Sequence, residues 1–282
     1  MIPGTHNSGA YSLLRTWDVF HWVWSRWIYC QEEDVWNQLV YGNRALDIRV
    51  GHASIEGSAP DPSRDFWVYH ETVKMKPLRT IVRDVRDFVI GTREVVILDF
   101  HRFPVGFDGL HIHLKLIGYI ERELGPWLIR RNGALPPSED LLNTPIGRLL
   151  EGDRRILVAY SHDDIHRDDF HGVDFLWPGV RHLWANTEEP SRLRDHLEEH
   201  QWKSCEGRLC ASMAHLTVDF DFHSAINLRK SVRSLARDIQ GNVTQWLRDR
   251  WWDSANIVST DYFLSNDVIH VAIEANRRRG RL

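Results

Sequence analysis

The residues of this sequence whose types could do chemistry come at the ends of short apolar runs. They are His6, Asp47, Arg49, His70, Asp99, His101 and Asp261. Two histidines with a carboxylate and an arginine favour acid–base chemistry on a phosphodiester, because one imidazole can accept the proton of an attacking hydroxyl and the other can protonate the leaving oxygen. A guanidinium would meet the charge that develops on the phosphoryl oxygens. No Ser or Cys stands in a nucleophile motif.

Each of these residues also has a structural explanation, such as a hydrogen-bonded core histidine, an ion pair or a helix cap. Asp47 and Arg49 stand two residues apart in the apolar run Ala45–Gly51, so in a strand their side chains point to the same face. Several strand ends that together supply acid, base and cation favour one shared site over separate structural roles.

The elements that must position these residues alternate between strands and helices. The expected strands are residues 1–5, 45–51, 66–70, 94–100, 154–160, 181–185, 209–216 and 256–263. The expected helices are residues 35–41, 77–89, 111–124, 191–200, 228–246 and 268–276. This alternation predicts a parallel α/β domain spanning residues 1–282, and about eight strands favour a closed (β/α)8 barrel over an open, doubly wound sheet. The active site of such a barrel lies at the carboxyl ends of its strands.

Composition narrows the function classes. The formal net charge is −4 and the pI is about 6.5, which disfavours nucleic acid as a partner. No run approaches the roughly 18 apolar residues of a spanning helix. The three cysteines form no disulfide framework, although Cys205 and Cys210 could pair across a short loop. Because the first strand begins at Met1, we expect a missing N-terminal lead-in, which leaves open whether the protein is cytoplasmic or secreted.

Tryptophan is unusually frequent, with 13 in 282 residues. Trp22, Trp24 and Trp27 follow the first strand closely. Amphipathic indoles favour a membrane–water interface. We therefore hypothesise that these three side chains reach a membrane beside the barrel mouth, the alternative being that they pack against helices.

Several segments resemble the X domain of phosphatidylinositol-specific phospholipase C, in particular its stand-alone X-domain-containing subfamily. The first four are Ile2–Gly9, Leu46–Arg49, Phe66–Glu71 and Val96–Phe103. Leu183–Thr187, Ala214–Thr217 and Asn256–Asp261 extend the resemblance in the right order over essentially the whole chain.

This resemblance implies a distorted TIM barrel that cleaves phosphatidylinositol at a membrane interface, to diacylglycerol and a cyclic inositol phosphate. It implies His6 as general base, His70 as general acid and Asp261 as the partner of His6. Arg49 matches an arginine that bacterial members use in place of a metal, and Asp47 accompanies it. We expect five further residues to bind the substrate: Asn7, Asp99, His101, Tyr160 and Trp184.

Calcium-dependent members of the family use an Asn after the first His together with three acidic residues. Here Asn7 and Asp47 remain, but the two Glu positions are matched to Ala45 and His101. Calcium takes six to eight oxygen ligands, and Arg49 adds a positive charge nearby. We therefore expect no metal or other cofactor, and calcium least of all. No protein partner is predicted.

Two alternatives stay open from the sequence. The first is a barrel that binds lipid with weak or no turnover. The second is a metal-dependent phosphodiesterase of the glycerophosphodiesterase or sphingomyelinase D type, which would carry acidic ligands on the second strand, where Arg49 stands instead.

Overall fold

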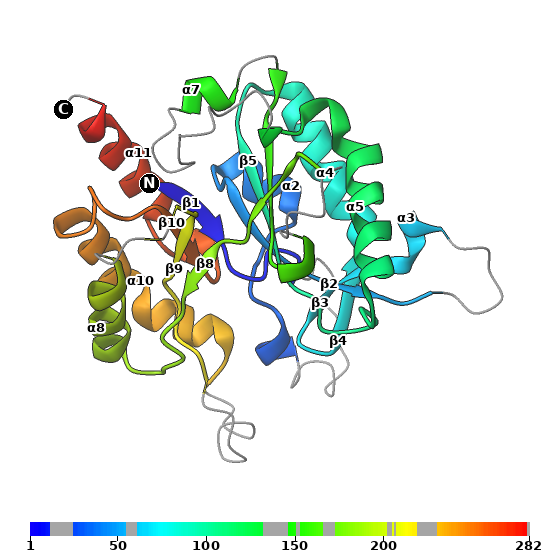
Figure 1. Cartoon of the computed structure of the whole chain (residues 1–282). Coiled ribbons are helices and arrows are strands. Elements are labelled where there is room, and N and C mark those ends of the chain that lie inside the picture. The colour runs from blue at the N-terminus through cyan, green and yellow to red at the C-terminus, as the bar shows by residue number, and fades with distance from the viewer. Residues whose placement is uncertain are drawn as a thin grey trace.

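A computed structural model describes residues 1–11, 25–54, 61–131, 146–150, 153–165, 173–201, 205, 207–218 and 230–280 of the chain. Its centre is a curled sheet with eight mutually parallel strands (Figure 1). These strands are β1 (Ile2–Thr5), β2 (Ala45–His52), β5 (Val96–Arg102), β6 (Ile156–Tyr160), β7 (Leu176–Pro178), β8 (Arg181–Leu183), β9 (Cys210–Met213) and β10 (Ile257–Thr260). The predicted TIM-barrel type is therefore confirmed.

The barrel is distorted because, within the described residues, its sheet does not close. The closed form that the number of strands favours is therefore wrong. The strand order is β7-β6-β5-β2-β1-β10-β9-β8, and β7 and β8, at its two ends, are not paired with each other within the described residues. β1 lies at the middle of this path, where it pairs with β10 from Ile2↔Ile257 to Thr5↔Thr260. The first and last strands of the chain thus bring their carboxyl ends together.

The expected third barrel strand has a different place. β3 (Phe66–His70) pairs antiparallel with the end of β2, and β4 (Val73–Pro77) completes the hairpin. The prediction that β3 is a barrel strand is wrong, because β2 is long enough for its last three residues to form a separate antiparallel ladder. The parallel strand missing from the prediction is β7, which has only three residues.

Helices cover the outside of the sheet (Figure 1). The longer ones are α2 (Val35–Tyr41), α4 (Leu78–Gly91), α5 (Leu110–Leu124), α8 (Pro190–Gln201), α10 (Val232–Asp249) and α11 (Val268–Arg279). The short ones are α3 (Pro62–Asp65), η1 (Gly125–Trp127), α7 (Ile146–Leu149), η4 (Asp163–Ile165) and η5 (Phe263–Ser265). Local sequence sets the ends of α2, since the Asp34 side chain accepts a hydrogen bond from the Asn37 backbone N–H and Gly42 adopts a φ of 123°.

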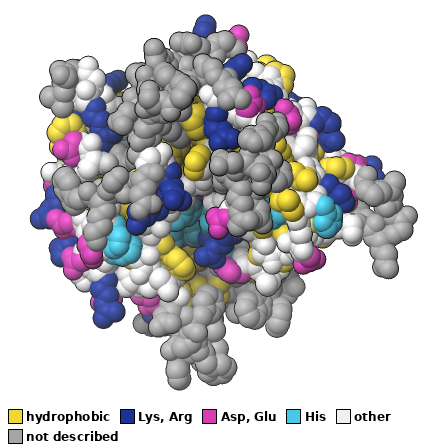
Figure 2. Space-filling model, in the orientation of Figure 1, with side chains coloured by type: hydrophobic (Ala, Val, Ile, Leu, Met, Phe, Trp, Pro, Cys, Tyr) yellow, Lys and Arg dark blue, Asp and Glu magenta, His cyan; other side chains and the backbone are white. Residues whose placement is uncertain are grey.

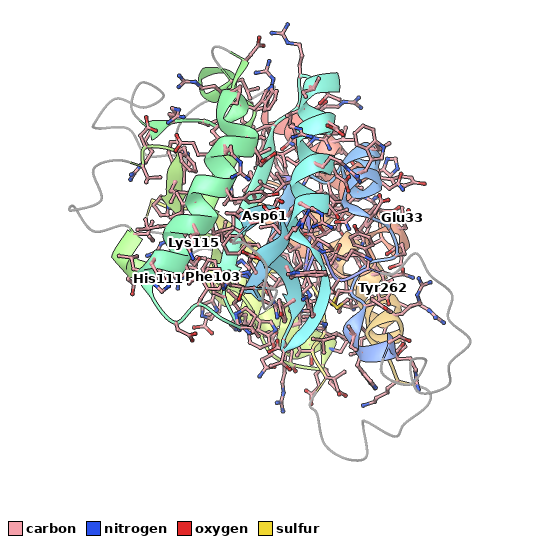
Figure 3. All side chains as sticks on the ribbon, turned by 90° about the vertical axis from the view of Figure 1, so that its right-hand side faces the viewer. Glu33, Asp61, Phe103, His111, Lys115 and Tyr262 are labelled. Carbon is pink, nitrogen blue, oxygen red and sulfur yellow. A yellow bond between two sulfur atoms is a disulfide. The ribbon has the colours of Figure 1, made fainter. Side chains whose placement is uncertain are left out.

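Strand alternation divides the buried residues into an outer and an inner set. Leu46, Ile48 and Phe100 face outward and pack in one apolar cluster with α4 and α5. Both helices stand upright toward the front of Figure 3, where His111 and Lys115 mark α5. Ala45 and Ile97 face inward, where they fill the barrel with apolar residues of β6, β7, β9 and β10. Asp47 and Arg49 continue the inward face of β2, so this face becomes polar toward the carboxyl ends of the strands.

In a further apolar cluster, residues in or next to the strands β8, β9 and β10 pack against the helices α8, α10 and α11. Its largest fully buried member is Trp251. A disulfide joins Cys205 to Cys210 at the start of β9, as the spacing of these cysteines allows. None of the described helices combines the length and apolarity that crossing a membrane requires.

Candidate active site

A cavity of about 450 Å³ opens at the carboxyl ends of the parallel strands. Its polar lining residues are His6, Arg49, His70, Glu71, His101, Arg102, His182, His215, Thr217 and Asp261. Figure 2 shows histidine side chains recessed near the middle of this face, among basic, acidic and apolar side chains. Histidines at the bottom of a cavity are what acid–base chemistry requires.

His6 directly follows β1 and is held through both ring nitrogens. Its Nδ1 lies 2.8 Å from Oδ1 of Asp261, and its Nε2 lies 3.0 Å from Nη2 of Arg49. Beneath it, the Gln31 side-chain amide donates to the carbonyls of His6 and Thr260, at 2.7 and 2.8 Å. These bonds fix the ends of β1 and β10 against each other, so the predicted pairing of His6 with Asp261 is present.

The charge states of this pair follow from burial. Burial, followed by the positive charge of Arg49, lowers the pKa of His6 well below 6.5. Burial raises the pKa of Asp261 to about 6, against the pull of nearby His215, His70 and Arg49. At neutral pH His6 is therefore uncharged and Asp261 ionised. The Nδ1–H of His6 then donates to Asp261, and the lone pair on Nε2 faces the Arg49 guanidinium, as a general base requires.

Arg49 links the base to the rim of the cavity. Its Nη1 donates to Oε1 of Glu71 at 2.9 Å, while its buried Nε has no hydrogen-bond partner among the described residues. Glu71 follows β3 with a left-handed φ of 49°, and its side chain is 68% exposed. A bound phosphate could therefore take the Nη1 donor over from this exposed carboxylate.

His70 reaches the same cavity from the end of β3. Its Nδ1–H donates to the carbonyl oxygen of Ile28, the two heavy atoms being 2.7 Å apart, which leaves Nε2 as the nitrogen for chemistry. Burial lowers the pKa of His70, and Arg49 lowers it further, although the Ile28 carbonyl favours the charged ring. Although β3 is not a barrel strand, the predicted acid thus shares the cavity with the predicted base.

Two histidine–carboxylate pairs lie beside these groups. Nδ1 of His101 is 2.8 Å from Oδ1 of Asp47, an ion-pair distance without hydrogen-bond geometry, and Nε2 of His182 bonds Oδ2 of Asp99 at 2.6 Å. Burial opposes ionisation of Asp47, but His101 and Arg49 outweigh it and hold the pKa of Asp47 well below its usual value. Burial likewise opposes the charged form of His182, but Asp99 outweighs it and raises the pKa of this ring.

Of the five predicted substrate-binding residues, two line the cavity, two are buried beside it, and Tyr160 lies outside the barrel. His101 and Trp184 line the cavity, and the Trp184 indole donates to Oγ1 of Thr217 at 2.8 Å. Asn7 and Asp99 are buried and absent from the cavity lining, and the Asn7 backbone N–H holds Oδ2 of Asp47 at 3.0 Å. Asp47, predicted as catalytic, also lies outside the lining, where its carboxylate contacts Asn7 and His101.

Tyr160 is a wrong prediction. It pairs with Phe100 across β5 and β6, and both side chains belong to the outer apolar cluster. The Tyr160 hydroxyl lies 2.7 Å from Nδ1 of His113 on α5, outside the barrel. Because Asp99 points inward, its neighbour Phe100 and the paired Tyr160 must point outward.

Of the three tryptophans that we hypothesise reach a membrane, the structure describes Trp27. Trp22 and Trp24 lie outside the described residues. Trp27 is 5% exposed and lines the cavity. For Trp27 the hypothesis that its side chain reaches a membrane is therefore wrong, because the ring is buried in the wall of the cavity.

His182, His215, Glu71 and Arg102 line the cavity but were missed as site residues. His215 stacks on His6 with ring centroids 3.9 Å apart and planes 11° from parallel. Burial is the main cause that lowers the pKa of His215 to about 3, so this ring stays neutral. The signal for His215 was available, since it closes an apolar run just as His6 does.

The donor atoms of the cavity do not fit calcium. Two groups among the described residues bring possible ligand atoms within 4.8 Å of one another: His6, Cys30 and Asp261, and Asp47, His101 and His182. Both are dominated by nitrogen or sulfur, whereas calcium requires oxygen. Ala45, matched in sequence to a calcium ligand, lies in the apolar interior below the cavity. Its methyl side chain offers no donor atom to a cation.

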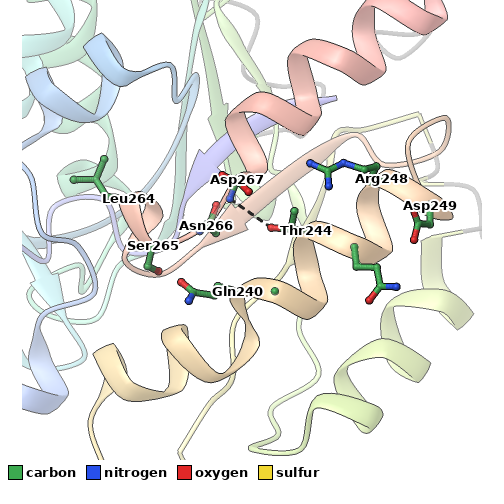
Figure 4. Close-up of a pocket in the computed structure, with 10 residues that line it drawn as sticks. Gln240, Thr244, Arg248, Asp249, Leu264, Ser265, Asn266 and Asp267 are labelled. Atoms are coloured by element: carbon green, nitrogen blue, oxygen red, sulfur yellow. Dashed lines mark hydrogen bonds between the residues drawn. The ribbon is translucent and has the colours of Figure 1, made fainter.

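A second hollow of about 380 Å³ lies between α10 and the turn before α11 (Figure 4). Gln240, Arg248 and Asp267 line it, and the Asp267 backbone N–H donates to Oγ1 of Thr244 at 3.4 Å. It has no histidine among its described lining residues, so it offers no acid–base pair.

The relatives found by comparison with curated proteins carry the same name. No protein family model matches the chain. The human PI-PLC X domain-containing protein 1 is 25% identical, covering 98% of this chain and 86% of its own length, and the Danio rerio protein of the same name is 22% identical over 84% and 71%.

Solved structures show the same fold. The phosphatidylinositol-specific phospholipase C from Listeria monocytogenes superposes with a TM-score of 0.67, covering 96% of this chain and 92% of that one at 14% identity. A structure of the phosphatidylinositol-specific phospholipase C from Staphylococcus aureus gives a TM-score of 0.66, with 97% of this chain and 91% of that one covered at 14% identity.

Proposed function

Because the chain belongs to the family of the PI-PLC X domain-containing proteins, we propose that it cleaves phosphatidylinositol at a membrane surface. The products are diacylglycerol and a cyclic inositol phosphate. The observation that carries this proposal is His6 held between Asp261 and Arg49, in the cavity that also contains His70.

The first chemical event is proton abstraction. Substrate phosphate draws the Arg49 guanidinium onto its oxygens, which frees the Nε2 lone pair of His6 for the inositol 2-hydroxyl. Nε2 takes the hydroxyl proton as that oxygen bonds to phosphorus, and Asp261 stabilises the imidazolium that forms. Arg49 stabilises the charge on the non-bridging oxygens in the transition state.

The second event is departure of the glycerol oxygen. The phosphorus–oxygen bond to diacylglycerol breaks, and His70 donates the Nε2 proton of its imidazolium to the leaving oxygen. The Ile28 carbonyl and the bound phosphate both favour this charged ring, against the effect of burial. Asp47 keeps His101 in place, and Asp99 keeps His182 in place.

Metal independence is part of the proposal. Arg49 occupies the position beside the base where a cation would otherwise balance phosphate charge. The nearby carboxylates are already engaged, Asp261 by His6 and Glu71 by Arg49. A hard cation would have to displace these partners.

The test is release of inositol phosphate from phosphatidylinositol vesicles, with and without a chelator, with the cyclic product identified by ³¹P NMR. We expect turnover that the chelator leaves unchanged. His6→Ala should lower kcat/KM by about 10³-fold, and Arg49→Ala by about 10²-fold or more. Arg248→Ala, in the second hollow, is the matched control and should retain full activity.

Two results would favour the alternatives. Vesicle binding without product indicates a lipid-binding barrel without turnover. Turnover that the chelator abolishes and zinc or calcium restores indicates a metal-dependent phosphodiesterase.

A further inference from the structure

One wall of the cavity is apolar. Leu216 and Val218 follow β9, and Val232 and Leu235 lie in the first turns of α10. Val232 and Leu235 are three residues apart and thus share one face of the helix. Leu216 and Leu235 belong to one buried cluster, against which Val218 packs. The wall is therefore continuous and rigidly backed.

This wall begins beside the catalytic groups. His215, which stacks on His6, immediately precedes Leu216. Trp27 and Ile28 extend the apolar lining to the other histidine, because the Ile28 carbonyl accepts the Nδ1–H of His70. Apolar surface thus adjoins both the base and the acid.

The position of the acid indicates what the wall contacts. In the proposed reaction His70 protonates the glycerol oxygen, so the diacylglycerol half of the substrate leaves on the side of His70 and Ile28. The groups attached to that half are acyl chains. A headgroup alone would leave this wall facing water, which is unfavourable for apolar surface.

We propose that this wall is an acyl-chain subsite, which receives the first methylene groups of one chain of the lipid substrate. The inference rests on the proposed function and deepens it, because it names as the preferred substrate a lipid with one acyl chain drawn partly into the cavity. The class of ligand is an inositol phosphodiester that carries at least one acyl chain.

The experiment compares two soluble substrates, so that no membrane is involved. One is dihexanoyl-phosphatidylinositol below its critical micelle concentration, and the other is acyl-free glycerophosphoinositol. Each fully buried methylene group improves affinity about fourfold, so two or three of them should lower KM for the acyl substrate at least about tenfold. Equal KM values for the two substrates would overturn the proposal.

A double variant tests whether the lower KM for the acyl substrate arises at the apolar wall. In Val218→Thr/Val232→Thr the side chains keep their shape and stay uncharged, and Thr is acceptable at the start of a helix. We expect KM to rise for the acyl substrate only, with kcat and the acyl-free reaction unchanged. Val40→Thr, at an exposed position on α2, is the matched control. If the double variant loses vesicle binding but keeps the preference for the acyl substrate, the wall is a membrane contact and not a chain subsite.

Equilibrium binding separates this inference from the proposed function. Both compounds are titrated calorimetrically into the His6→Ala variant, which needs no turnover. Tighter binding of the acyl compound supports the subsite even if the wild-type protein cleaves neither. Equal binding refutes the subsite even if both are cleaved.

Discussion

At the scale of single residues, burial sets the working charge of the two histidines. His6 is enclosed between Asp261 and Arg49, and burial with Arg49 lowers its pKa. Burial also lowers the pKa of His70 below 6.5. A low pKa suits the base, which must be uncharged, but it opposes the acid, which must carry a proton. The two requirements overlap only at slightly acidic pH.

We therefore predict a narrow bell-shaped pH profile of kcat/KM with an optimum near pH 6. As the pH falls through about 6, Asp261 takes up a proton and ceases to support the imidazolium, and His6 protonates further down. As the pH rises, His70 loses its proton below 6.5, the ordinary pKa of a histidine, because burial lowers the pKa of this ring. The measurement is kcat/KM on the monomeric dihexanoyl substrate from pH 4.5 to 8.5.

Asp261→Asn is the control for the acidic side of this profile. An amide does not titrate, so this limb should move to lower pH, where only His6 protonates, while the overall rate falls. An optimum above pH 7.5 for the wild-type protein would contradict the assignment of His70 as the acid.

Strand-end reasoning predicted His6, Arg49, His70 and Asp261, because a polar residue that directly follows an apolar run carries a local signal. Tyr160 was predicted wrongly, because which face of a strand looks inward depends on the register against its neighbour. His182 was missed because its strand has three residues and almost no apolar pattern. The pairing of His6 with Asp261 came from the family resemblance. The partners of the other histidines depend on long-range packing, which spacing along the chain does not encode.

At the scale of elements, the hairpin β3–β4 matters most, because it carries the proposed acid although it stands apart from the parallel sheet. Alternation of side chains is the same in parallel and antiparallel strands, so the sequence located β3 but not its pairing. Helices with a strong 3.6-residue period, such as α4 and α5, were predicted to within about two residues. β3 docks on β2 through Val50↔Val68 and Gly51↔Trp67.

We predict that Gly51→Ala weakens this docking. An added Cβ would overlap the ring of Tyr69, which is buried on β3 one residue before His70. The expected cost is about 1–3 kcal/mol of unfolding free energy, together with a lower kcat because His70 shifts. Urea unfolding and steady-state kinetics measure the two effects.

Tyr69→Ala is the second single variant of a double-mutant cycle with Gly51→Ala. If the overlap is the cause, the combined variant should be at least about 1 kcal/mol more stable than the sum of the single effects. Gly118→Ala on α5, where an added Cβ meets nothing within 4 Å, should be neutral or stabilising. Full additivity would show that Gly51 acts in another way.

At the scale of the whole molecule, the site joins two halves of the barrel. Arg49 and His70 come from the side backed by α4 and α5, whereas His215 and Asp261 come from the side backed by α10 and α11 (Figure 1). His6 follows β1, which lies between β2 and β10 where the two sides meet. The inner apolar cluster bridges these sides, since Ala45 and Ile97 pack there with residues of β9 and β10. If residues 1–282 form one domain, as the sequence predicts, this shared interior should make the two sides unfold cooperatively.

We predict that both halves unfold together and that activity is lost in the same step. In urea, activity, far-UV circular dichroism and tryptophan fluorescence should share one midpoint. Leu116→Ala on α5 and Leu247→Ala on α10 each remove a buried side chain that does not line the cavity, at a cost of about 2–5 kcal/mol. Either substitution should lower all three midpoints equally, because the shared interior couples the halves. If Leu247→Ala moved the loss of activity to lower urea while most of the circular dichroism signal stayed in place, the α10–α11 half would be a separate folding unit, and the barrel would not be a single cooperative domain.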